Sequence, residues 1–119
     1  MTYEKAAQVL ASARNQEAGK PIARNTRLFK RGNDYAIRFH YTDVVTIHAD
    51  GTFTLNAGSW QSVTTKARMN EYAPVRIYQK DFNWFVMPDY NPKIKDDEKS
   101  QIPPSFQNGM RVNHLGQVI

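Results

Sequence analysis

Basic side chains, with aromatic rings elsewhere along the chain, are the residues here that could do chemistry. Lysine and arginine number 16 against 11 aspartates and glutamates, which gives a formal net charge of +5. Arg24, Arg27, Lys30 and Arg31 lie in one stretch without an acidic residue, and Arg38 follows soon after. Arginine forks match phosphate oxygens in two-pronged contacts. The pattern therefore predicts binding of an anion such as a nucleotide, nucleic acid or phosphate.

A nucleotide site would also need a ring to stack on the base and a group to read its edge. Aromatic side chains stack on bases, and an amide both donates and accepts hydrogen bonds. The candidate ligand-binding residues are Arg27, Arg38, Phe82, Trp84, Asn91, Phe106, Asn108 and Arg111. A solvated sheet face with core aromatics explains the same residues, and composition alone favours that simpler interpretation.

A second phosphate site is possible at the start of a predicted helix. Free backbone amides at a helix N-terminus can receive a phosphate. Thr65 would lie in the first turn, and Lys66 and Arg68 would add positive charge. Ordinary N-capping explains these residues equally well.

No catalytic or metal-binding pattern accompanies the basic residues. The histidines His40, His48 and His114 are not at metal-ligand spacing, and the chain has no cysteine. Neither a Gly-x-Ser-x-Gly motif nor a phosphate-binding glycine loop occurs. We therefore expect a binding protein without a cofactor or metal, not an enzyme.

The elements that must position these residues follow from hydrophobic periodicity. Thr2 can cap an N-terminal helix within residues 1–20, which should stop near Asn15. Residues 24–56 alternate between apolar and polar side chains across turn residues, which predicts a meander of four strands. Ser62 or Thr64 can cap a short helix. A hairpin over 75–80 and 82–87, a long loop at 89–104 and a last short strand complete the chain.

These elements predict an α+β fold in one domain, residues 1–119. It has an N-terminal helix and a twisted antiparallel sheet of about six strands, with one short helix inserted. Residues 1–20 lack the long apolar run of a signal peptide, and no stretch approaches the length of a transmembrane helix. We expect a cytoplasmic protein without a membrane partner. A chain this small also favours a homo-oligomer, because much of its surface stays exposed.

Several short motifs occur in a characteristic order. They are Asn25-Thr26-x-Leu28, Ala36-Ile37-Arg38-x-His40-x-Thr42-Asp43-Val44-Val45-Thr46, Asp50-Gly51-Thr52-x-Thr54-Leu55-Asn56, Gly58-x-Trp60-x-x-Val63-Thr64-Thr65-Lys66-x-Arg68-x-Asn70 and Phe106-x-Asn108-Gly109-Met110. The pattern resembles a domain of many small phage proteins. Within that group the chain is similar to the phage Thoeris anti-defence family, whose members act as nucleotide sponges. It departs from the common pattern at Ala57 and Ser59 and in a longer loop at 89–103.

The resemblance implies a function. Such proteins bind cyclic ADP-ribose isomers in the cytoplasm of the infected bacterium without cleaving them, and some form hexamers built from dimers with separate sites for cyclic trinucleotides. For such a ligand we expect Arg111 with Arg27 or Arg38 to contact the diphosphate and Phe82, Trp84 or Phe106 to stack on adenine. Asn91 or Asn108 would contact the base or the ribose. The alternatives are a phage protein that binds nucleic acid, an inhibitor that binds a host defence protein, and an enzyme that cleaves the nucleotide.

Overall fold

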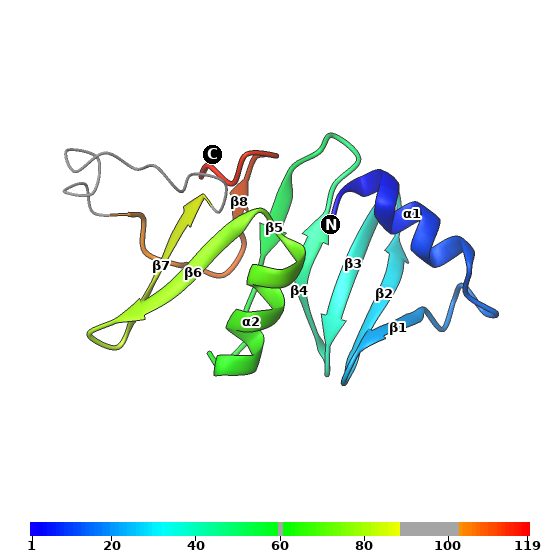
Figure 1. The fold of residues 1–119 in the computed structure, drawn as a ribbon, viewed down its shortest axis with the longest axis horizontal. Helices are drawn as coiled ribbons and strands as arrows, with labels where there is room; N and C mark the ends of the chain where they lie inside the picture. Colours follow the sequence, from blue (N-terminus) through cyan, green and yellow to red (C-terminus); the bar gives the residue numbers. More distant parts are fainter. Residues whose placement is uncertain (60, 89–102) are drawn as a thin grey trace.

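The computed structural model describes residues 1–59, 61–88 and 103–119 (Figure 1). In chain order the elements are α1 (Tyr3–Ala11), β1 (Lys20–Ala23), β2 (Thr26–Arg31), β3 (Asp34–Phe39), β4 (Thr42–Ile47), β5 (Phe53–Leu55), α2 (Val63–Tyr72), β6 (Val75–Lys80), β7 (Asn83–Pro88) and β8 (Met110–Val112). The predicted α+β fold is confirmed, with an N-terminal helix, an antiparallel sheet of six strands and a short inserted helix.

The main sheet has the strand order β1-β2-β3-β4-β5-β8. Strands β2 to β5 are the meander predicted over residues 24–56. Strand β1, which the sequence did not predict, pairs with β2 and places Pro21 opposite Arg27. Proline lacks a backbone N–H, and an edge strand tolerates that loss. Strand β8 returns from the C-terminal part to pair with β5.

Strands β6 and β7 form a separate two-stranded sheet next to α2 (Figure 1). Their turn consists of Asp81 and Phe82, one residue later than predicted, with φ angles of 53° and 67°. Two residues with positive φ match the twist of a two-residue hairpin. The predicted loop at 89–104 falls mostly outside the described residues.

Helix α1 is shorter than the sequence predicted. The Thr2 side chain accepts a hydrogen bond from the amide of Lys5 at 3.1 Å, so the predicted N-cap is confirmed. The helix ends at Ala11 rather than near Asn15. The Asn15 side chain accepts from the amides of Glu17 and Ala18, which holds this segment in a turn instead of a helix.

One face of the main sheet, the core face, carries the apolar residues. Leu28, Ile37, Val45 and Leu55 lie side by side across four strands, and all four are fully buried. The buried apolar residues of both helices belong to the same cluster: Ala6, Leu10, Met69 and Tyr72. Both helices therefore cover the core face.

The opposite face of the sheet, the outer face, is polar and carries no helix. Phe29, Ala36, Thr46, Thr54 and Arg111 form a row across five strands. Arg27 and Arg38 lie opposite each other in a neighbouring row. A bulge in the pairing of β3 with β4 also turns Val44 inward, where it is buried although the alternation placed it outward.

Candidate functional site

Arg27 and Arg38 form a cross-strand pair of cations on the outer face. Their guanidinium groups bond to backbone carbonyls: an Arg27 terminal nitrogen donates to Ala18 O at 3.2 Å, and Arg38 Nε donates to His40 O at 3.0 Å. Within the described ranges neither arginine forms an ion pair. Like charges directly opposite each other destabilise a sheet pair. The pair is therefore a place where an anion would be stabilised.

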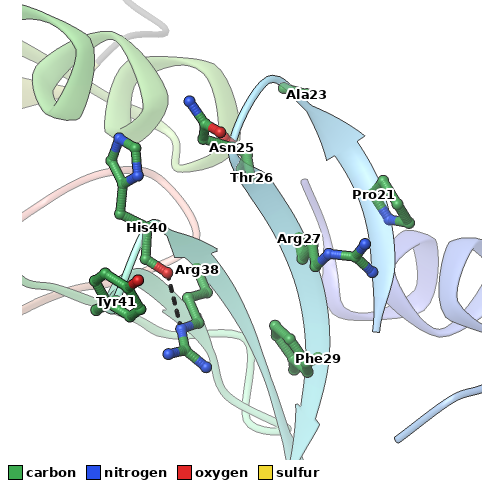
Figure 2. A pocket seen from close by; sticks show the side chains of 9 residues that line it. All are labelled: Pro21, Ala23, Asn25, Thr26, Arg27, Phe29, Arg38, His40 and Tyr41. Atoms are coloured by element: carbon green, nitrogen blue, oxygen red, sulfur yellow. Dashed lines mark hydrogen bonds between the residues drawn. The ribbon is translucent and has the colours of Figure 1, made fainter. Parts of the chain in front are cut away.

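A hollow of about 400 Å³, which we call the outer hollow, contains both arginines (Figure 2). Its lining residues are Pro21, Ala23, Asn25, Thr26, Arg27, Phe29, Arg38, His40 and Tyr41. Figure 2 shows Arg27 on one side and Arg38 with Tyr41 on the other, and the Phe29 ring between the two arginines. Ligand pockets commonly have volumes of about 300–1,000 Å³. The outer hollow has room for a small phosphorylated ligand.

Two tight turns, each with one left-handed residue, form one rim of the outer hollow. Asn25 between β1 and β2 has a φ of 55°, and His40 between β3 and β4 has a φ of 54°. The His40 amide donates to Asn25 O at 3.0 Å and ties the turns together. Left-handed backbone at residues other than glycine is uncommon and is concentrated at binding sites.

A second, more open hollow of about 570 Å³ adjoins the first. Arg38 and Tyr41 line both hollows. The second also contains Arg31, but the Arg31 guanidinium is paired with both carboxylate oxygens of Asp43 at 3.1 and 3.3 Å. Its cationic charge is thus already neutralised.

Among the residues that the structure describes, the other predicted binding residues do not lie beside Arg27 and Arg38. Trp84 and Phe106 are 5% and 7% exposed, and their rings pack edge to face with centroids 5.5 Å apart. Phe82 is exposed at the tip of the β6–β7 hairpin. Asn91 lies outside the described residues.

Asn108 and Arg111 have structural partners. The Asn108 side chain accepts from Ala57 N at 3.0 Å and donates to Gly58 O at 2.7 Å, which fixes the chain after β5. Arg111 in β8 is separated from β3 by two strands. It donates to Thr52 Oγ1 at 2.6 Å and lies 3.5 Å from an Asp50 carboxylate oxygen.

The second predicted phosphate site, at the start of α2, is also occupied by internal contacts. Ser62 is the N-cap and accepts from Thr65 N at 3.0 Å, and the two hydroxyls lie 2.9 Å apart. Arg68 Nε donates to Thr26 Oγ1 at 3.0 Å, and the guanidinium pairs with Glu71 at 3.3 Å. Lys66 is partly exposed. Thr65 and Arg68 thus act in capping α2 and in holding it to β2.

Of the nine residues that line the outer hollow, sequence reasoning named Arg27 and Arg38 and missed the other seven, among them Asn25, Phe29, His40 and Tyr41. Phe29 lies on the same face of β2 as Arg27, because residues two apart on a strand share a face. That spacing was a usable signal. The sequence placed Tyr41 in a turn and gave it no role, because its sequence neighbours do not indicate how exposed its ring is.

Carboxylates on the outer face sit in hydrogen-bond networks. His48 Nδ1 lies 2.9 Å from an Asp34 oxygen, and Ala49 N donates to the other oxygen at 3.1 Å. These bonds, that to His48 above all, lower the pKa of Asp34. Hydrogen bonds from Thr52 likewise lower the pKa of Asp50. Among the described residues no group of three or more potential metal ligands occurs.

Fold and site together define a small α+β protein with an arginine-lined hollow on one sheet face. The chain belongs to the Kyanoviridae Gp96 protein family, whose model matches residues 3–113. The expected phage-protein domain is confirmed. No curated protein and no solved structure matches the chain. No helix in the described part of the chain is long and apolar enough to cross a membrane.

Proposed function

We propose that the outer hollow binds a phosphate-bearing nucleotide and that the protein sequesters this ligand without cleaving it. The observation that carries the proposal is the Arg27–Arg38 pair, two cations that extend from facing positions of β2 and β3 to opposite sides of one hollow and have no carboxylate partner among the described residues. A diphosphate would accept from both guanidinium groups and remove their mutual repulsion. The proposal assigns no ligand contact to Arg111, whose guanidinium binds the turn at residues 50–52.

The lining supports binding more than hydrolysis. It offers arginines and aromatic rings and no carboxylate. Its one histidine, His40, packs on Phe39 with ring centroids 4.3 Å apart and points away from both guanidinium groups in Figure 2, so it is not placed as a general base beside them. The ligand class that we propose is the cyclic ADP-ribose isomers, and the motif resemblance supports this choice. Sequestration of such a signal would be an anti-defence activity in the infected cytoplasm, which is consistent with a phage family.

Calorimetry tests the proposal. The purified protein is titrated with cyclic ADP-ribose isomers, with linear ADP-ribose as the control, and the ligand is then released by heat and identified by chromatography. We expect saturable binding of a cyclic isomer and its recovery unchanged. Binding of linear ADP-ribose alone would support a nucleotide site but contradict the choice of a cyclic isomer as its ligand. A chemically altered product would contradict sequestration, and the absence of heat with every nucleotide would contradict the site.

A second candidate function is binding of single-stranded nucleic acid. The observation that favours it is the continuity of the two hollows through Arg38 and Tyr41, which extends the basic surface beyond one small ligand. Single strands bind to basic grooves with exposed aromatic rings. Affinity for an oligonucleotide that falls steeply with added salt would support this function. A nucleotide sponge would show no such affinity.

A further inference from the structure

Tyr41 is the aromatic side chain at the outer hollow that is most open to solvent. Its side chain is 90% exposed, although it lies in a tight turn between two central strands. A ring so exposed contributes little to the core, so folding does not explain its presence. Its position in the walls of both hollows places it next to the arginine pair.

The cation of Arg38 lies between two rings. Its guanidinium carbon is 5.7 Å from the centroid of Tyr41 and 5.9 Å from that of Phe29. Such cation–π contacts orient both the ring and the guanidinium. The ring next to Arg38 thus combines a stacking surface with an adjacent positive charge, which are the two features that a nucleotide requires.

The turn that carries Tyr41 is braced on both sides. His40 donates through its amide to Asn25 O and accepts through its carbonyl from Arg38 Nε, each at 3.0 Å. These bonds hold the left-handed His40 backbone and so fix the direction in which the chain leaves it. A fixed turn presents its ring with less entropy to lose on binding.

We infer that Tyr41 is the base-stacking residue of the site, on which the base of a nucleotide lies while its phosphates contact Arg27 and Arg38. This inference rests on the proposed function and adds a specificity residue to it. A site with this stacking residue should bind a ligand that joins a planar base to two phosphates more tightly than it binds inorganic phosphates. The rings of Trp84 and Phe106 are buried against each other, and Phe82 belongs to the other sheet.

The test compares Tyr41→Ala, Tyr41→Phe and Phe82→Ala by calorimetry. The probes are cyclic and linear ADP-ribose, which contain a base, and inorganic pyrophosphate, which does not. Loss of one stacked base should weaken ADP-ribose binding about tenfold in Tyr41→Ala. Pyrophosphate binding should fall by much less than ADP-ribose binding there, because Arg38 loses one orienting ring but keeps its charge and its bond to His40 O. Tyr41→Phe should retain ADP-ribose affinity because the ring remains.

The outcomes separate this inference from the proposed function. Wild-type protein that binds no ADP-ribose probe would overturn both. Wild-type binding that persists fully in Tyr41→Ala would overturn the stacking role and leave the nucleotide site standing. A loss in Phe82→Ala instead of Tyr41→Ala would move the stacking surface to the hairpin tip. An equal loss of pyrophosphate and ADP-ribose binding in Tyr41→Ala would also count against stacking.

Discussion

Arg27 and Arg38 differ from three other arginines of the fold in the kind of partner they have. Arg31, Arg68 and Arg111 each pair with a carboxylate, at 3.1, 3.3 and 3.5 Å. Arg27 and Arg38 instead donate to backbone carbonyls. A carbonyl orients a guanidinium without neutralising its charge, so these two side chains keep their attraction for a phosphate.

Removal of the Arg38 charge should impair binding more than removal of an equal charge elsewhere. A hydrogen bond to a charged group contributes about 1.5–3 kcal/mol, so we expect Arg38→Gln to bind a nucleotide at least about tenfold more weakly. The matched control is Arg76→Gln, which removes an exposed arginine from β6. Calorimetry measures both. Equal losses in the two variants would show that only net charge matters, and an unchanged affinity in Arg38→Gln would exclude the site.

We expect the Asp34 carboxylate to make the free energy of unfolding depend on pH. Its hydrogen bond with His48 lowers the pKa in the folded state below the ordinary value of 3.8. A lowered pKa gives stability that is present above the unfolded pKa and is lost as pH falls through the folded pKa. Asp34→Asn should therefore be less stable than wild type at neutral pH, and the difference should shrink in acid.

Urea unfolding at several values between about pH 7 and pH 2 would measure this difference. Asp81→Asn in the exposed hairpin turn is the control, and its stability difference from wild type should be small. A stability gap for Asp34→Asn that stays constant down to the lowest pH would contradict the assigned role of the hydrogen bond.

At the scale of elements, local pattern explains why the meander was predictable. Alternation over residues 34–39 and turn residues such as Gly32-Asn33 specify strands and hairpins without distant contacts. Strand β1 has four residues and contains Pro21, so it lacks both signals. Two features of the candidate site could not be predicted from local pattern. Arg27 faces Arg38 because of the register between β2 and β3, and Trp84 is buried against Phe106, which is distant in the sequence.

Asn70 joins α2 to the β6–β7 hairpin. Its amide donates to Ile77 O at 3.0 Å, and its oxygen accepts from Ile77 N at 2.6 Å. Ile77 is 2% exposed, so Asn70→Ala would leave two backbone groups without partners in a buried place. We expect the free energy of unfolding to fall by about 1–3 kcal/mol. Chemical denaturation would measure this.

Gln79→Ala is the matched control for Asn70→Ala. Gln79 lies on the same strand as Ile77 but is exposed, so loss of its amide should change stability by less than about 0.5 kcal/mol. If the two variants were equally stable, the contact between Asn70 and the hairpin would not hold the two elements together.

The whole molecule is elongated, with extents of 49 × 27 × 20 Å. Strands β1 and β2, which line the outer hollow, lie near one end of its long axis, and the tip of the hairpin lies at the other (Figure 1). Another molecule that contacted the hairpin tip would therefore leave the outer hollow open to a ligand. Phe82 at this tip is 94% exposed.

We expect the protein to form a dimer or a larger homo-oligomer. A chain of 119 residues leaves a large fraction of its surface exposed, and association buries part of it. Sedimentation equilibrium over a range of protein concentrations would measure the mass, which should exceed the 13.7 kDa of one chain. A single species of one-chain mass at every concentration would contradict the expectation.

The most direct test of the nucleotide site is an NMR titration of the ¹⁵N-labelled protein with cyclic ADP-ribose. We predict that amide shifts concentrate at residues 23–29 and 36–42, the two segments that contain Arg27 and Arg38. The chemical shifts of the amides in β6 and β7 should not change, because that hairpin belongs to the other sheet. Shifts confined to the hairpin or to α2, or no shifts at saturating ligand, would contradict the account.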